Sequence, residues 1–399
     1  MWSGAEYVEK KVDHIKANDN KIHCEDGTVI PYDVLVINVG SRTRGAEKVI
    51  GVWENSMTSR PINDLLPKVN KKEKDMQEQG IIPDLVVCGA GAAGIEMAMA
   101  FKQRWSRVFG TPIKAKILCE SPEIMIHEKA ASRKEILRAL AQQDISIEVN
   151  CQIKEIKKDG VECADGRVFP CNSVFWATGA EPQQVILKSD LETSKGYFKV
   201  NDQLQSTSHP NVFAGGDCIT MATYEKEHFP PKAGVYAVRA GPIIAQNVAH
   251  YLKKEPMVDY IPQKEFLSLL SCANEVAVGA KFGIAFTGRW VWKMKDWIDR
   301  SFMKIFDGNY LFKDFQEKKF AEPLDQGELY EEETKDLADK LAPIKKRVAE
   351  MDVETAGKLM SCSEEEEEFV ERLQILDRMA RDEAFQKGVI ENFKPPYGL

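Results

Sequence analysis

Apolar and polar positions alternate in blocks that predict a mixed α/β fold. Lys21–Cys24 and Val29–Pro31 have the pattern of strands on either side of a turn, and Val34–Val39 is a nearly continuous β-branched run that ends at Gly40-Ser41. Such runs are typical of buried parallel strands. A hairpin pattern followed by a strand ending in glycine returns at 160–179. The chain is therefore expected to leave one domain and later return to it.

A second block follows the order strand, glycine turn, helix, strand. Leu85–Cys88 is apolar, Ile95–Phe109 has helical character, and Ala115–Cys119 predicts a second strand that ends in Glu120. This is a βαβ unit of the expected length.

The C-terminal third changes pattern twice. Residues 266–286 predict short antiparallel strands, and residues 289–306 predict an amphipathic helix, because apolar side chains recur there at three-and-four spacing. Those side chains are Trp290, Val291, Met294, Trp297, Ile298, Phe302, Ile305 and Phe306. Beyond them lies a tail rich in Glu and Lys, with helices predicted at 336–351 and 365–385.

The glycine segment after Leu85–Cys88 carries the strongest chemical signal. Gly89 suits a tight turn, Gly91 lets backbone amides approach a pyrophosphate, and Gly94 permits close packing of helix on strand. Phosphates then lie at the positive N-terminus of the helix. Glu120 is placed to accept hydrogen bonds from ribose hydroxyls and to repel a 2′-phosphate. The alternative is a packing turn with a surface glutamate; the pattern favours a nucleotide site that prefers NADH to NADPH.

A second signal is the turn at Gly216-Asp217, which follows an apolar run. A short acidic side chain there can bind a ribityl hydroxyl, although Gly-Gly-Asp alone is most often an ordinary turn. Specificity comes from the helix that begins near Lys232-Ala233. Its dipole could stabilise negative charge on the pyrimidine edge of a reduced flavin.

Charge and composition exclude some classes. The 399 residues are 43% hydrophobic and carry a net charge of −8. That acidity lies in residues 315–399, with 13 Lys and Arg against 22 Asp and Glu. No basic footprint for nucleic acid is present, and no apolar run is long enough to cross a bilayer. The nine cysteines are dispersed and lack zinc spacing. This indicates a soluble or peripheral protein of a reducing compartment, without a metal site.

The ordered motifs together resemble the pyridine nucleotide-disulfide oxidoreductase superfamily, including the type II NADH dehydrogenases. They most closely resemble the flavoprotein module found fused to selenide, water dikinase. The resemblance extends from about Tyr7 to Lys313. It rests on 32–35 with 40–41, 88–96, 176–180, 204–207 leading into 216–218, 232–239, and the helix from Trp290 to Phe302.

The resemblance implies two Rossmann-like dinucleotide-binding domains, with the FAD domain interrupted by the NAD domain, then a small α+β interface domain and a helical tail. The expected bounds are 1–60 and 181–262 for FAD, 61–180 for NAD(H), 263–313 for the interface domain and 314–399 for the acidic extension. FAD would be bound by Gly40, Ser41, Gly216, Asp217, Lys232 and Ala233, and NADH by Gly89, Gly91, Gly94, Glu96, Glu120 and Gly179.

The implied activity is hydride transfer from NADH to FAD, with electrons passed to a quinone or another small acceptor. No acid or base is assigned to catalysis, because the cofactors carry the chemistry. One departure from the family keeps alternatives open: no G-x-G-x-x-G precedes Tyr7. The sequence is then either truncated, or belongs to a flavin-less NADH-binding or scaffold protein. A third interpretation is a flavoprotein that acts as an interaction module through its tail and aromatic helix.

The helix from Arg289 has two interpretations of its own. Its tryptophans and basic residues could rest on a membrane surface, or its apolar face could pack on its own sheet or on a second subunit in a homodimer. Asp296 and Asp299 dilute the basic face and favour packing.

Overall fold

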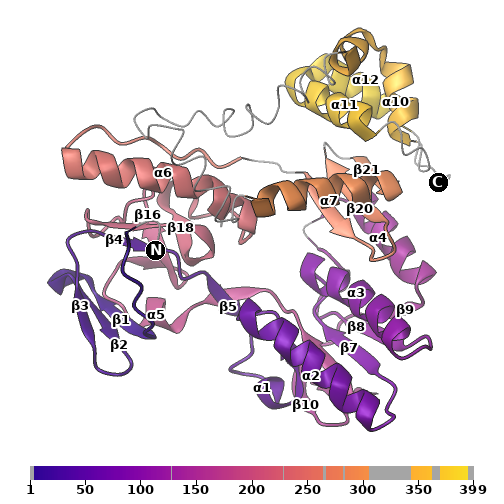
Figure 1. The fold of residues 1–399 in the computed structure, drawn as a ribbon, viewed down its shortest axis with the longest axis horizontal. Helices are drawn as coiled ribbons and strands as arrows, with labels where there is room; N and C mark the ends of the chain where they lie inside the picture. The colour runs from indigo at the N-terminus through magenta and orange to yellow at the C-terminus, as the bar shows by residue number, and fades with distance from the viewer. Residues whose placement is uncertain are drawn as a thin grey trace. The chain divides into compact units, whose positions relative to one another are not determined.

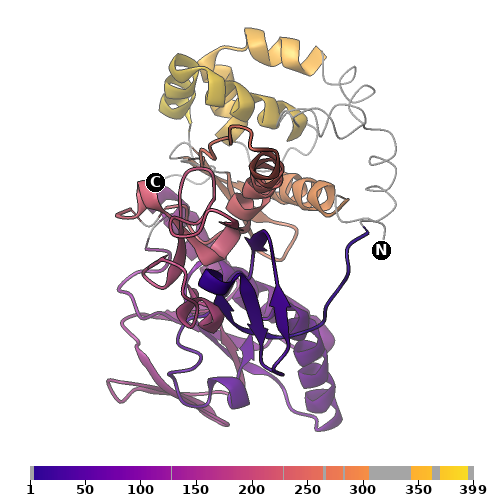
Figure 2. The same ribbon diagram turned by 90° about the vertical axis from the view of Figure 1, so that its left-hand side faces the viewer.

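The structure, a computed structural model, describes residues 4–126, 128–227, 229–263, 267–281, 284–304, 343–361 and 369–393. These form two compact units. The first unit contains residues 4–44 and 180–263, and the second contains residues 45–179 together with the described residues from 267 onward. The chain therefore leaves the first unit and returns to it. In Figures 1 and 2 the colour follows the chain from indigo at the N-terminus to yellow at the C-terminus.

The first unit is built from small sheets and one long helix. Its strands are β1 (Val12–Lys16), β2 (Lys21–Cys24), β3 (Val29–Pro31), β4 (Leu35–Ile37), β5 (Ser41–Thr43), β14 (Ala180–Pro182), β15 (Thr193–Ser194), β16 (Tyr197–Val200), β17 (Val212–Ala214) and β18 (Ile219–Met221). Its helices are α5 (Gln184–Leu187) and α6 (Gly234–Lys253). β1, β2 and β3 form an antiparallel sheet, whereas β4 and β17 pair in parallel.

The second unit contains a five-stranded parallel sheet in the order β6-β13-β7-β8-β9. These strands are β6 (Met57–Thr58), β7 (Asp84–Cys88), β8 (Lys114–Leu118), β9 (Ile145–Glu148) and β13 (Ser173–Trp176). The helices of this region are α1 (Val52–Asn55), α2 (Leu65–Glu78), α3 (Ala92–Val108) and α4 (Ala130–Gln142). β7 is buried on both faces. Leu85 and Val87 pack in the cluster that includes Trp105 of α3. Val86 and Cys88 pack in a second cluster on the other side of the strand.

That second cluster lies under a three-stranded antiparallel sheet of β10 (Ile153–Lys157), β11 (Gly160–Cys163) and β12 (Val168–Pro170). A disulfide in this cluster joins Cys151 to Cys163. The dispersed cysteines predicted a reducing compartment, in which a disulfide is not expected. The spacing gave no sign of it, because the two residues become neighbours only through the hairpin. The compartment stays a prediction.

The remainder of the second unit is a small sheet with helices. It comprises β19 (Ser268–Ser271), β20 (Ala277–Lys281), β21 (Ile284–Gly288), α7 (Arg289–Lys304), a helix at 343–350, α10 (Val353–Ser361), α11 (Phe369–Arg381) and α12 (Glu383–Asn392). Of the helix predicted at 365–385, residues 365–368 lie outside the described part. The rest is divided between α11 and α12, because the Asp382 carboxylate accepts from the Phe385 backbone N–H and caps α12. Residues 305–342, which include the start of the other predicted tail helix, lie outside the described part.

The apolar face of α7 is packed within this unit. Trp290, Val291 and Met294 are buried in one cluster with Phe286 of β21 and residues of the tail helices. The Arg372 guanidinium of α11 lies 4.7 Å from the centre of a Trp290 ring. Trp297, predicted on the same face, is 48% exposed. Packing on the chain's own sheet is therefore the interpretation that the contacts favour.

The strand predicted at 34–39 is partly exposed. Val36 and Val39 are 48% and 39% exposed, so the prediction of a buried strand at 34–39 was wrong in part. Val39 lies beyond the end of β4, and Val36 lines the open cavity between β4 and α6. Within the described ranges, no helix combines the length and apolar character needed to span a membrane.

The packing of α7 predicts unequal effects of its tryptophans on stability. Trp290→Ala should lower the free energy of unfolding by about 3–5 kcal/mol, because a fully buried aromatic side chain is lost. Trp297→Ala should change it by less than about 0.5 kcal/mol, as expected for a surface position. Denaturant unfolding measures both. Equal effects would show that α7 is not anchored through Trp290.

Candidate functional site

Parallel pairing gathers several predicted residues at one edge of the large sheet. Cys88 at the end of β7 pairs with Leu118 of β8 and with Trp176 of β13. The loops that leave these strands therefore begin side by side, and they carry Gly89, Glu120 and Gly179. The carboxyl edge of such a sheet is where ligands bind in open α/β folds.

The three loop glycines have different physical roles. Gly89 adopts a φ of +117°, and a Cβ on it would lie 2.2 Å from the Ala177 carbonyl oxygen. A Cβ on Gly94 would lie 2.0 Å from the Gly89 carbonyl oxygen. Gly91 is exposed, and a Cβ there would meet nothing within 4 Å. The first two glycines thus serve close backbone packing, and Gly91 leaves space beside the backbone for a ligand.

That space lies at the start of α3, for which Gly91 is the N-cap. No side chain caps this end, so the first amides of a 17-residue helix have no side-chain acceptor. Free amides at a helix N-terminus attract anions. Glu120 is exposed and, within the described residues, forms no hydrogen bond, so its carboxylate is available to a ribose.

Glu96 lies elsewhere in the second unit. Its carboxylate accepts a hydrogen bond of 2.7 Å from the Ser271 backbone N–H and lies 3.8 Å from the Lys295 ammonium. Burial raises the pKa of this carboxyl. The geometry gives Glu96 a role in joining α3 to β19, and its assignment to NADH stays a prediction.

A second set of predicted residues meets in the first unit. Because β4 and β17 run in parallel, the turns that follow them are neighbours. The Ser41 hydroxyl donates a hydrogen bond of 2.9 Å to the Asp217 carboxylate. Gly216 has a φ of +75°, and a Cβ on it would lie 2.7 Å from Oδ1 of Asn38. The turn is thus a tight backbone cradle with one carboxylate, and Gly40, at a φ of +65°, lies in the neighbouring turn.

Lys232 is a half-buried cation beside this turn. Its ammonium donates to the Ile219 carbonyl and lies 4.1 Å from the centre of the Tyr197 ring. Burial lowers the pKa of Lys232 to about 8, against the opposing charge of Asp217. Ala233 is the N-cap of α6, again with no side-chain cap. An anion bound here would compensate a desolvated ammonium and face a helix N-terminus.

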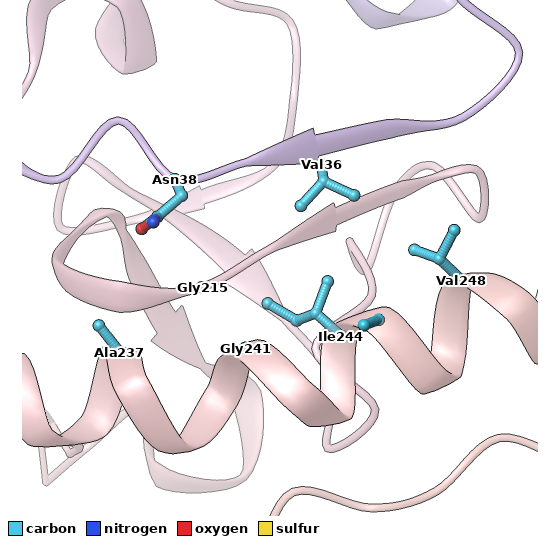
Figure 3. A pocket seen from close by; sticks show the side chains of 8 residues that line it. Val36, Asn38, Gly215, Ala237, Gly241, Ile244 and Val248 are labelled. Carbon is cyan, nitrogen blue, oxygen red and sulfur yellow. The ribbon is translucent and has the colours of Figure 1, made fainter. Parts of the chain in front are cut away.

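An apolar cavity adjoins the same turn. It has a volume of about 330 Å³ and lies between β4, the Gly215 backbone and α6. Figure 3 shows Asn38 at one end and Val36, Ile244 and Val248 along the rest. Its volume is at the lower end of the range for small-molecule sites.

Sequence reasoning did not single out Asn38 or Arg60. Asn38 is a polar residue within the β-branched run before Gly40, a signal that was present in the sequence. The Arg60 guanidinium lies 3.3 Å from the Gly179 carbonyl oxygen, across a sequence separation of 119 residues. No local pattern predicts such a contact.

The family is clear from comparison with known proteins. The family model for pyridine nucleotide-disulphide oxidoreductases matches residues 3–241. The chain belongs to this family, which confirms the superfamily that the motifs predicted. The family's name gives the class of cofactor, a pyridine nucleotide. The likeness to the module fused to selenide, water dikinase stays a prediction.

Curated relatives have related names. The chain is 27% identical over 275 residues to a probable NADH dehydrogenase of Dictyostelium discoideum, covering 62% of this chain and 58% of that protein. It is 29% identical over 259 residues to an NADH oxidase of Methanocaldococcus jannaschii, covering 61% and 53%. The human ferroptosis suppressor protein 1 is 24% identical, covering 69% and 71%. The chain thus spans little more than half the length of the first two.

Solved structures share the fold. The sulfide:quinone oxidoreductase of Aquifex aeolicus superposes with a TM-score of 0.61 at 20% identity, covering 75% of each chain. NDH2 of Plasmodium falciparum, solved with NADH, gives 0.62 at 14% identity, covering 79% of this chain and 84% of that one. These matches confirm the α/β fold class with Rossmann-like domains.

The glycine geometry predicts two distinguishable failures. Gly91→Ala should leave the melting temperature nearly unchanged yet weaken nucleotide binding about tenfold or more, equivalent to about 1.4 kcal/mol, because the methyl group fills the ligand's approach. Gly94→Ala should destabilise the fold by about 1–3 kcal/mol through overpacking. Thermal unfolding and NADH fluorescence titration measure these. A Gly91→Ala protein with normal affinity would contradict the cradle.

Proposed function

We propose that the chain is an FAD-dependent NADH oxidoreductase that passes electrons from NADH through FAD to a quinone or another small oxidant. The observation that carries the proposal is the open space at Gly91. A strand, a positive-φ glycine, an uncapped helix and an available carboxylate converge there. These are the parts that a dinucleotide's pyrophosphate and ribose require.

The residues of the second unit suit NADH. The backbone amides at the start of α3 would bind the pyrophosphate, and Gly91 would let it approach. Glu120 would accept from both ribose hydroxyls and would repel a 2′-phosphate, which supports NADH over NADPH. Gly179, with a φ of +101°, lies at the end of the neighbouring loop, where a side chain in that conformation would be strained.

The residues of the first unit suit the charged parts of FAD. Lys232 and the N-terminus of α6 offer positive potential, Asp217 offers an acceptor for a ribityl hydroxyl, and Gly216 lets the backbone come close. Ser41 orients the Asp217 carboxylate by its hydrogen bond. An anionic ligand would stabilise the half-buried ammonium of Lys232, so these residues fit FAD.

When bound, NADH would supply a hydride and FAD would accept it, and this chemistry belongs to the cofactors. The chain's own part is to bind, orient and provide electrostatic stabilisation. Lys232 holds its proton below about pH 8 and therefore presents a positive charge at neutral pH. No side chain is assigned as a proton-transferring group.

A quinone is proposed as the electron acceptor because of the names of related proteins. The relatives include a type II NADH:quinone oxidoreductase of Haemophilus influenzae, 21% identical and covering 64% of each chain. A quinone is therefore the first acceptor to assay. We also propose that the protein forms a homodimer and contacts a membrane surface.

Anaerobic reduction of the purified protein tests the function. The protein should be yellow after FAD is added and unbound flavin removed, and NADH should bleach the flavin absorbance faster than NADPH does. The Gly91→Ala protein keeps its flavin site but should bleach slowly, which separates nucleotide binding from flavin binding. A colourless protein that still binds NADH would support a flavin-less NADH-binding role. Flavin that NADH does not reduce would support an interaction module.

The pKa of Lys232 predicts how flavin affinity depends on pH. The ammonium attracts the negative charge of FAD, and this attraction is lost as pH rises through about 8, or higher when the bound anion stabilises the proton. Affinity should therefore fall on the alkaline side. Lys232→Met should bind FAD weakly, with little pH dependence.

Flavin fluorescence titration measures the affinity for FAD between about pH 6 and about pH 10. This range starts well below the usual lysine pKa and ends close to it. Lys226→Met is the control, because Lys226 is an exposed lysine on the same loop. A wild-type affinity that is flat across this range would rule out Lys232 as the charge that holds FAD.

A further inference from the structure

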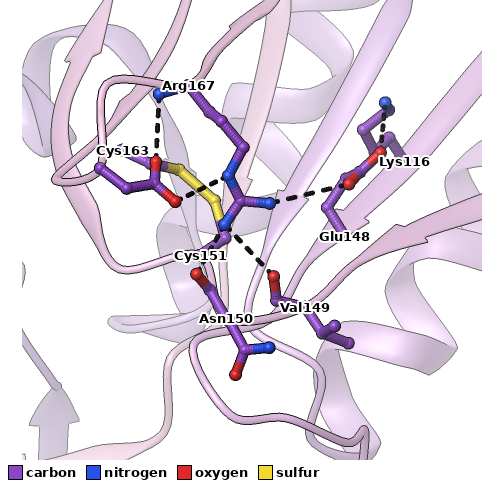
Figure 4. Close-up of a disulfide and its surroundings, with 8 residues drawn as sticks. Lys116, Glu148, Val149, Asn150, Cys151, Cys163 and Arg167 are labelled. Atoms are coloured by element: carbon purple, nitrogen blue, oxygen red, sulfur yellow. Dashed lines mark hydrogen bonds and ion pairs between the residues drawn. A yellow bond between two sulfur atoms is a disulfide. The ribbon is translucent and has the colours of Figure 1, made fainter.

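The proposed function does not use the disulfide of the second unit. Cys151 and Cys163 are each only 1% exposed, and the bond joins the turn after β9 to the end of β11. Figure 4 shows this bond beside Arg167, whose side chain reaches toward the backbone at 149–150. The position matters because β8 and β9 are parallel neighbours, so the turn after β9 lies next to the loop that carries Glu120.

Backbone hydrogen bonds join these two loops directly. The Cys119 N–H donates to the Glu148 carbonyl at 2.8 Å, and the Cys151 N–H donates to the Cys119 carbonyl at 2.9 Å. The Asn150 N–H donates to the Ser121 carbonyl at 3.2 Å. Glu120 is thus flanked in sequence by Cys119 and Ser121, whose backbones are hydrogen-bonded to 148–151. A shift of 148–151 would be transmitted through these hydrogen bonds to the backbone on both sides of Glu120.

Arg167 holds the same segment from the hairpin side. One guanidinium nitrogen donates to the Asn150 carbonyl at 2.6 Å and lies 3.3 Å from the Val149 carbonyl oxygen. The guanidinium also pairs with Asp165 at 2.7 Å and lies 3.8 Å from the Glu148 carboxylate. The Arg167 carbonyl in turn accepts from the Cys163 N–H at 2.9 Å. Arg167 and the disulfide therefore act on one short segment together.

We propose that the Cys151–Cys163 disulfide and Arg167 form a clamp that positions Glu120, so that the affinity and selectivity for NADH depend on the oxidation state of the cysteine pair. This inference rests on the proposed nucleotide site. Reduction breaks the sulfur–sulfur bond and adds two electrons and two protons, giving two thiols. An external dithiol supplies them and becomes a disulfide itself. Both sulfurs are buried, so the reductant acts when the hairpin opens locally.

The clamp acts on the adenosine end of the nucleotide, which makes its effect specific. Loosening it should weaken NADH, whose ribose hydroxyls bind Glu120, more than NADPH, whose 2′-phosphate the same carboxylate repels. The preference for NADH over NADPH should narrow. Reduced nicotinamide mononucleotide has no adenosine, so its affinity should not change. A general loss of stability would not produce this pattern.

The experiment compares three variants of the full chain. Cys151→Ala/Cys163→Ala removes the cross-link, and Arg167→Met removes the guanidinium while leaving the disulfide in place. Cys24→Ala is the matched control, because Cys24 is a buried free cysteine in β2 of the first unit. Mass spectrometry of the unreduced wild-type protein, digested with trypsin, checks whether the peptides that end at Lys154 and Arg167 are linked.

The expected result is a linked peptide pair and an NADH dissociation constant raised roughly fivefold or more in both clamp variants, within the usual range of coupling between sites. Cys24→Ala should match the wild type. Normal NADH affinity and selectivity in Arg167→Met and in the double variant would overturn the clamp, and so would unlinked peptides. The proposed function would then still stand if Gly91→Ala weakens binding. A wild-type protein that does not bind NADH would overturn both proposals.

Discussion

The second unit depends on how closely three backbone segments approach one another. Gly89, Gly94 and the Ala177 carbonyl come together at distances that leave no room for a Cβ on either glycine. This contact fixes where α3 begins relative to the strands β7 and β13. The helix N-terminus, the open side of Gly91 and the loop with Glu120 are then consequences of the sheet. Under the proposed function, recognition of a dinucleotide at this edge would need only correctly placed amides and one carboxylate.

Electrostatics in the first unit follow a different logic. The ammonium of Lys232 is partly removed from water, and it lies near a carbonyl, an aromatic ring and the charge of Asp217. Such a group costs free energy until an anion arrives. The turn at Gly216 and the beginning of α6 add partial positive charge from backbone amides. Under the proposed function, a bound anion would lower the free energy of this partly desolvated ammonium.

Much of the fold of the second unit could be predicted from the sequence. The glycine spacing and the apolar run at 85–88 predicted the βαβ unit, because close packing of helix on strand admits few other residues. The three-and-four periodicity predicted α7, and Asp296 and Asp299 favoured packing over a membrane surface, but the pattern did not predict the exposure of Trp297. The partial exposure of Val36 and the orientation of Glu96 did not follow, since both depend on which element lies opposite. The disulfide and the Arg167 contacts could not be predicted either, as they join residues across a hairpin whose register is set by the whole fold.

The order of segments along the chain has a consequence for how the protein is made. β4 has its partner β17, and β5 has its partner β14, only on the far side of the entire segment 45–179. During synthesis from the N-terminus, the first strands emerge long before their partners do. The parallel sheet of the second unit is complete once β13 has been made. The edges of β4 and β5 therefore stay unpaired while the segment 45–179 is made, and during that interval chaperones can protect them.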